Sequence, residues 1–154
     1  MRIKAIVGKS TIANNNNRIY PRDILKKSIE VFKSSNKDIY LYPSFETDMS
    51  DITNVMGLLK DIHLDDSGNL YADIEILPSK ENLFNMLLKT NHVIVMNFEG
   101  RESRYGKHNI IEECYFDTLA FTDNPSWRDC EIESIDGEPV DSKESMWDII
   151  KFYF

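Results

Sequence analysis

Residues 54–77 constrain the fold more than any other stretch, because they have the pattern of two strands joined by a tight turn. In the second half, four apolar residues alternate with polar ones, namely Leu70, Ala72, Ile74 and Ile76. Strands send successive side chains to opposite faces, so this alternation predicts one buried and one exposed face. In the first half we expect Met56, Leu58, Ile62 and Leu64 to share the inward face, interrupted by Lys60. The intervening Asp-Asp-Ser-Gly-Asn favours a hairpin turn.

The segments before this hairpin predict a strand, a helix and a second short strand. Residues 1–7 alternate like a strand, and the Asn14–Asn17 run favours a loop. Pro21 suits a helix start, and apolar residues at mixed three- and four-residue spacing predict a helix over 22–33. A short strand is expected over 39–42, and an exposed acidic loop over 44–53.

The segments after the hairpin predict a further helix and two or three strands. Ser79 is a good N-cap for a helix that ends near Thr90. A strand over 92–98 should turn at Glu99-Gly100 and lead into a flexible loop over 101–109. Residues 110–122 predict a strand broken once near Cys114, and residues 130–132 a short edge strand.

Composition indicates a single globular domain and narrows its partners. The chain has 154 residues and a formal net charge of −8, which argues against nucleic acid as a main partner, because phosphate binding needs clustered basic residues. No apolar run approaches the roughly 20 residues that span a bilayer. The amino terminus has the pattern of a strand rather than a signal peptide, so we expect synthesis and folding in the cytoplasm. Cys114 and Cys130 are too few for a metal framework and are expected to be buried thiols, and we expect no cofactor.

The carboxyl-terminal segment is predicted to be separate from the main body, residues 1–133. Residues 134–139 are the candidate linker, and Asp141 and Glu144 have capping-box spacing before a helix over 142–153. That helix would be apolar nearly all round. It could cover an open end of the body, or present Trp147, Ile150 and Phe154 to a partner.

Five pieces of the chain, in order, resemble the tailed-phage prohead proteases, serine proteases that cleave capsid and scaffold proteins during head maturation. The pieces are residues 17–25 (NRIYPRDIL), 41–43 (LYP), the hairpin with Gly57 and 68–72 (GNLYA), 87–100, and 119–126 (LAFTDNPS). The first and the fifth are the most specific. The resemblance covers about residues 10–132 and implies an α+β fold, a compact antiparallel β-barrel with packed helices, shared distantly with herpesvirus assembly proteases.

The chain departs from that family where the resemblance places catalysis. The family has a histidine before the proline, a serine on the strand before the glycine and an acidic residue before the last strand's apolar pair. This chain has Tyr42, Asn97 and Ala120 at those places. Serine attack needs a neighbouring base, and a phenol with a pKa near ~10 is a poor base at neutral pH. We therefore expect no protease activity from this site, and expect the three side chains to lie in one neighbourhood.

Displaced chemistry is the alternative, with Cys114 or Ser103 as the nucleophile and a histidine as the base. His63, His92 and His108 stand in positions typical of surface residues, and no two have the short spacing of zinc ligands. No basic residue adjoins Cys114 in the sequence to lower its pKa.

Three functions remain at this stage. The chain is expected to be a non-enzymatic virion structural or assembly protein, such as an auxiliary or decoration protein of the capsid. It would bind capsid or other virion proteins and pass from the host cytoplasm into the virion. The alternatives are a maturation protease with displaced catalytic residues, or a regulatory partner of an active prohead protease. The fold by itself does not choose among them.

Overall fold

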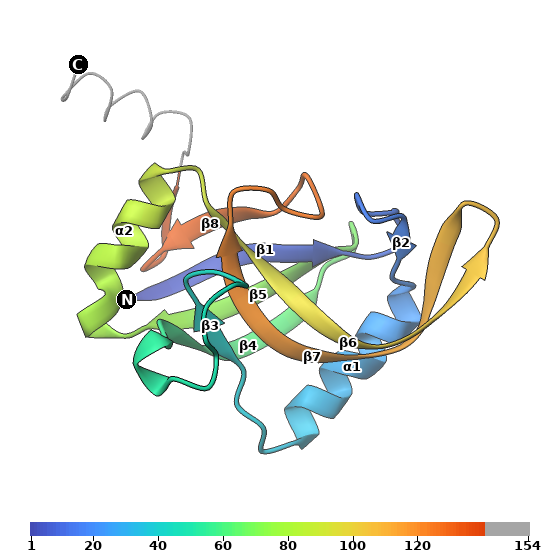
Figure 1. Cartoon of the computed structure of the whole chain (residues 1–154), viewed down its shortest axis with the longest axis horizontal. Helices are drawn as coiled ribbons and strands as arrows, with labels where there is room; N and C mark the ends of the chain where they lie inside the picture. The colour runs from blue at the N-terminus through green and yellow to red at the C-terminus, as the bar shows by residue number, and fades with distance from the viewer. Residues whose placement is uncertain (141–154) are drawn as a thin grey trace.

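The computed structural model describes residues 1–140, which form one sheet with two helices packed against it (Figure 1). The strands are β1 (Arg2–Lys9), β2 (Arg18–Ile19), β3 (Tyr40–Tyr42), β4 (Gly57–Leu64), β5 (Asn69–Ile76), β6 (Val93–Tyr105), β7 (His108–Thr122), β8 (Glu131–Ile135) and β9 (Glu138–Pro139). The helices are α1 (Arg22–Ser34) and α2 (Glu81–Lys89), with single 3₁₀ turns at Ile52–Asn54 and Pro78–Lys80.

The sheet is mixed and curls into a half-barrel, which corrects the predicted closed antiparallel barrel. Its strand order is β2-β7-β3-β4-β5-β1-β8-β9, with β6 on the other edge of β7. Both β2 and β3 run parallel to β7, and α1 is the crossover that joins them. No strand pairing within residues 1–140 joins β6 to β8, so the curl does not close. The broader prediction of an α+β fold is consistent with this architecture.

The predicted hairpin is present as β4 and β5, but the buried face of β4 was predicted wrongly. Gly57, Leu59 and Ile62 are buried, whereas Leu58 is only partly buried. The register with β5 shifts between Leu59 and Asp61. A bulge adds one residue to a strand and so reverses the alternation of its faces. The bulge at Lys60 explains why the inward positions are odd-numbered before it and even-numbered after it.

The predicted turn at Gly100 and loop over 101–109 are wrong, because β6 continues through them and pairs with β7 as far as Tyr105. The two strands form a long ribbon that projects from the body beside β2 (Figure 1). Gly100 permits close pairing rather than a turn, since a Cβ there would lie 1.9 Å from the carbonyl oxygen of Glu113. The turn lies instead at Gly106, which has φ +61°.

Helix α2 begins later than predicted. Residues 78–80 form a 3₁₀ turn, and no side chain caps the first turn of α2, so Ser79 is not its N-cap. The amino-terminal ammonium group lies 3.3 Å from Glu81 in that turn, which ties β1 to the helix. The main-chain nitrogen of Ile76 also donates to the carbonyl oxygen of Met1 at 2.8 Å, so both ends of the 76–81 connection lie against the start of the chain.

Residues 134–139, predicted as a linker, belong to the β8–β9 hairpin. Strand β8 also pairs with β1, so it lies inside the sheet and not at its edge. The predicted helix over 142–153 and the predicted contact residues Trp147, Ile150 and Phe154 lie outside the described residues. Among residues 1–140, no helix has the length and apolarity needed to cross a bilayer.

Candidate functional site

Three neighbouring strands bring the predicted site residues together on the outer side of the sheet. Tyr42 on β3 is the register partner of Ala120 on β7, and Asn97 on β6 pairs with Thr118, two residues earlier on β7. Register partners point to the same face, so all of these side chains share one side of the sheet. Strand spacing puts the Cα atoms of Tyr42 and Asn97 about 12 Å apart. We call Tyr42, Asn97, Ala120 and the adjacent Asp117 the outer-face centre.

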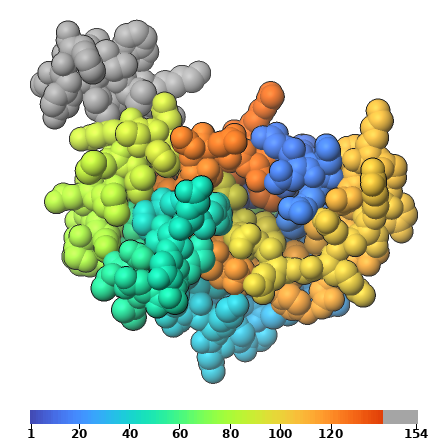
Figure 2. All heavy atoms as spheres, in the orientation of Figure 1, coloured from blue at the N-terminus to red at the C-terminus, as the bar shows by residue number. Residues whose placement is uncertain are grey.

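Tyr42 is held in place within this centre. It is 5% exposed, and its hydroxyl donates a hydrogen bond to the carbonyl oxygen of Met49 at 3.3 Å. Burial raises the pKa of the Tyr42 hydroxyl, and the nearby Tyr40 and Asp117 raise it further. At neutral pH the phenol is therefore a hydrogen-bond donor with no capacity to act as a general base. The loop that carries Met49 covers part of the same side of the molecule, beside α2 (Figure 2).

Asp117 is the one member of the centre that the sequence did not indicate. It stands at a register shift between β6 and β7, and its carboxylate accepts a hydrogen bond from the Asn97 side-chain amide at 3.2 Å. Thr118 beside it has a buried hydroxyl with no hydrogen-bond partner within residues 1–140. The sequence gives no sign of this carboxylate, because the pairing of β6 with β7 sets the position of Asp117 beside Asn97.

Cys114, the first candidate for displaced chemistry, is a buried thiol. It is 5% exposed, and its sulfur lies 3.1 Å from the hydroxyl of Ser28 on α1. The same hydroxyl donates to the carbonyl oxygen of Cys114 at 2.7 Å. Burial raises the pKa of the Cys114 thiol, which disfavours the thiolate that attacks substrates. Cys130 is likewise buried, and burial together with Asp129 raises its pKa to about 12.

Ser103 and the three histidines are likewise dispersed. Ser103 donates to the carboxylate of Glu112, and His63 stacks on Tyr71 with ring centroids 5.1 Å apart. His92 Nδ1 lies 2.9 Å from the hydroxyl of Thr90, which also bonds the last carbonyls of α2. In the described part of the chain, no hydrogen bond joins a histidine to Ser103 or Cys114, and no group of three potential ligands could hold a metal ion.

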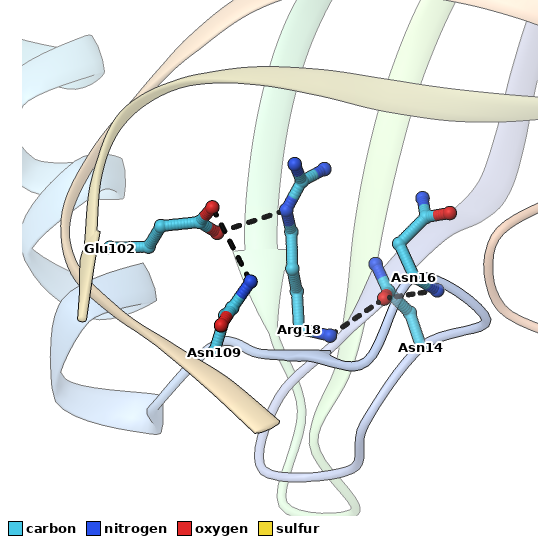
Figure 3. A network of polar contacts seen from close by, with 5 residues as sticks. All are labelled: Asn14, Asn16, Arg18, Glu102 and Asn109. Atoms are coloured by element: carbon cyan, nitrogen blue, oxygen red, sulfur yellow. Dashed lines mark hydrogen bonds and ion pairs between the residues drawn. The ribbon is translucent and has the colours of Figure 1, made fainter. Parts of the chain in front are cut away.

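The two most specific pieces of the resemblance, with Asn14 and Asn15 beside the first of them, meet at one corner of the molecule. The main-chain nitrogen of Asn15 donates to the carbonyl oxygen of Ser126 at 2.9 Å, and its side-chain amide donates to that of Pro125 at 3.2 Å. Asn14 Oδ1 accepts from the main-chain nitrogens of Asn16 and Arg18 at 2.9 and 3.0 Å (Figure 3). We call residues 14–20 and 124–127 the asparagine corner.

Aromatic packing completes this corner. The Tyr20 ring lies 4.5 Å from that of Phe98 and 5.3 Å from that of Trp127, centroid to centroid. Both Tyr20 and Trp127 are buried. The Asn14–Asn17 run therefore forms a loop, as predicted. Its hydrogen bonds hold β2 against β7, since the main-chain N–H of Asn109 on β7 donates to the carbonyl oxygen of Asn17 at 2.8 Å. These retained pieces of sequence serve the fold.

The fold is similar to that of the bacteriophage T4 capsid assembly protease, gp21, with a TM-score of 0.65 and 14% sequence identity over 80% of this chain and 82% of that chain. No protein-family model and no curated protein matches the sequence. At this identity the match establishes the fold, a prohead-protease-like one, and leaves activity open.

Proposed function

We propose that this chain is a non-enzymatic protein of phage head assembly, built on a prohead-protease fold that has lost its catalytic residues. Its partners would be capsid or other virion proteins, met in the host cytoplasm, and it would remain with the particle as an auxiliary protein. Support for the phage setting comes from the fold shared with the T4 capsid assembly protease. The sequence resemblance, over about residues 10–132, points to the same setting.

The observation that carries the proposal is the chemistry of the outer-face centre. The resemblance places a base, a nucleophile and an acid there, and this chain has a buried phenol, an amide and a methyl group. Asp117 supplies a carboxylate, but a carboxylate without a histidine and a serine cannot form an acyl-enzyme. Loss of such a set costs on the order of 10⁶ in rate for serine proteases.

Displaced catalysis has less support. Ser103 is bonded to a carboxylate and forms no hydrogen bond with a histidine in the described residues, and the Cys114 thiol is buried with a raised pKa. The role of a regulatory partner for an active protease uses the same binding capacity and differs only in which protein is bound.

The test has two parts. Purified protein is incubated with the capsid and scaffold proteins of the same phage, and cleavage is followed by mass spectrometry; the expected result is no cleavage above background. Cleavage that Cys114→Ala or Ser103→Ala abolishes, and that the matched surface change Ser67→Ala leaves intact, would overturn the proposal in favour of displaced catalysis.

The second part asks whether the protein is present in purified virions, by quantitative proteomics. A fixed copy number per capsid is expected for an auxiliary protein. Presence in proheads followed by complete absence from mature virions would contradict that role and favour the regulatory one.

A further inference from the structure

A pocket on the β6–β7 ribbon lies apart from the outer-face centre and is built around Tyr20. Its volume is about 180 Å³. The buried side chains of Tyr20, Ile111 and Cys114, with the partly buried Phe98, form its apolar part, and its charged lining residues are Arg18, Glu99, Arg101 and Glu102. Sites for cofactors and drug-sized ligands usually have about 300–1,000 Å³, so this pocket suits a much smaller group.

The Tyr20 hydroxyl is an unused donor in this pocket. The residue is 6% exposed, yet no hydrogen bond within residues 1–140 involves its hydroxyl. A hydroxyl that lines a pocket and has no protein partner can donate its hydrogen bond to water or to a ligand. Burial raises the pKa of Tyr20 to about 12, so the hydroxyl keeps its proton at neutral pH, and Arg18, Cys114 and Glu102 line the same pocket.

Arg18 presents further unused donors at this pocket. Its Nε donates to Glu102 at 3.0 Å, and Glu102 in turn accepts from the side chain of Asn109 at 3.5 Å, which fixes the guanidinium plane. The two terminal nitrogens point away from these partners and form no contact with the residues drawn in Figure 3. No hydrogen bond in the described part of the chain uses these terminal nitrogens. A planar pair of N–H donors matches the two oxygens of a carboxylate.

From this arrangement we propose that the Tyr20 pocket binds a carboxylate on a short apolar body. The carboxylate would accept hydrogen bonds from the Arg18 terminal nitrogens and the Tyr20 hydroxyl, and the apolar body would rest on Phe98 and Ile111. The pocket is small beside the sites of drug-sized ligands, which limits the ligand to a short-chain acid, an Asp or Glu side chain, or a chain-terminal carboxylate. The site does not depend on the proposed role in head assembly. A carboxylate on a capsid or other virion protein could nevertheless bind there and so contribute to that role.

The test uses butyrate as the probe and the neutral butyramide as its matched control. Spectra of ¹⁵N-labelled protein are followed for the Gly100 amide and the Arg18 Nε signal. Butyrate is expected to give saturable shifts with a dissociation constant on the order of millimolar, and butyramide none.

Two conservative variants assign the donors. Tyr20→Phe should weaken butyrate binding about tenfold because it removes one hydrogen bond to a charged acceptor. Arg18→Lys should weaken it about fivefold or more because a point charge replaces the planar fork. Tyr105→Phe, the same chemical change on the exposed turn of the ribbon, should bind butyrate as the wild type does. Thermal melts establish that each variant is folded.

Peptides then separate the possible sources of the carboxylate. Acetyl-Gly-Glu-Gly-amide is compared with its Gln counterpart, and acetyl-Gly-Leu with a free carboxyl end with its amide. Tighter binding of one acid than of butyrate identifies the source, and equal binding of all three acids still supports a carboxylate site. Absence of saturable shifts with every acid, equal binding of butyramide, or full binding by Tyr20→Phe would overturn the site. None of these results bears on proteolysis, so failure here is distinguishable from failure of the proposed function.

Discussion

The asparagine corner and the outer-face centre both correspond to pieces of the prohead-protease resemblance, yet they differ in what they retain. The corner contains family-like residues, and these form a dense set of hydrogen bonds and aromatic contacts together with the adjoining Asn14 and Asn15. At the centre, strand pairing brings together Tyr42, Ala120 and Asn97, none of which is the base, nucleophile or acid that the resemblance implies there. Residues that hold a fold are needed whatever the protein does, whereas catalytic residues are needed only for catalysis.

The comparison teaches that resemblance in sequence is a poor guide to activity when it is concentrated in such a corner. Asn14, Asn15 and Pro125 satisfy main-chain groups of a long connection, and no reaction requires them. Substitutions at the asparagine corner should therefore lower the free energy of unfolding more than substitutions at the outer-face centre do. The following predictions rank these effects.

The largest loss is expected from Trp127→Ala. Trp127 is 5% exposed and packs on Tyr20 and Phe98, so truncation removes a large buried side chain and leaves a cavity. The free energy of unfolding, measured with urea, should fall by about 3–5 kcal/mol. Tyr115→Ala, a change at a residue that is 45% exposed, is the control and should cost less than about 1 kcal/mol. Equal losses in the two variants would contradict a corner that holds the fold.

The second prediction concerns alkaline pH. The Tyr20 pKa is raised from its ordinary value of 10.0 to about 12, mainly by burial. Below pH 10 the phenol is neutral in both the folded and the unfolded chain, whereas between pH 10 and about 12 it ionises preferentially in the unfolded one. The wild type should therefore lose about 2–3 kcal/mol more stability over that window than Tyr20→Phe does. Urea titrations at several pH values measure the difference in unfolding free energy between the wild type and Tyr20→Phe. This difference should stay constant from pH 7 to 9. If it also stayed constant up to pH 12, Tyr20 would not be buried.

A smaller loss is expected from Asn14→Ala. The side-chain oxygen of this buried residue accepts two main-chain hydrogen bonds, and its removal leaves those N–H groups without a partner. The expected cost is about 1–3 kcal/mol of unfolding free energy. Asn16→Ala, in the same run but with an exposed side chain, should be near neutral. Equal effects of the two substitutions would show that the network of Figure 3 contributes no stability.

The smallest effect is expected at the outer-face centre. Tyr42→Phe removes one hydrogen bond, to Met49 at 3.3 Å, and keeps the ring, so it should cost about 0.5–1.5 kcal/mol. Urea unfolding measured beside the Asn14→Ala variant gives the comparison directly. A loss at Tyr42 greater than that at Asn14 would reverse the ranking and make the centre a structural element in its own right.

Much of the fold could be predicted from the sequence, because strand and helix patterns are local. The β4–β5 hairpin and α1 follow from apolar spacing and turn residues within windows of fewer than about 20 residues. Burial of Cys114 and Cys130 was also predicted. The β6–β7 ribbon could not be predicted in the same way, since its polar residues become strand only through pairing with each other. The bulge at Lys60 likewise depends on the facing strand, which local alternation does not report.

For the candidate site, the sequence alone determined the chemistry that is missing, because a phenol, an amide and a methyl group have fixed reactivity wherever they lie. It also determined the acidic charge and the turn of the central hairpin. Tertiary structure decided which residues meet: β3 is distant in the chain from β6 and β7, and the pairing of these strands placed Asp117 beside Asn97 and near Tyr42. The pairing of β2 with β7 likewise placed Arg18 beside Glu102. The physical reason is that hydrogen-bond registers between distant strands set these positions, whereas periodicity along one strand sets only the face on which each side chain lies.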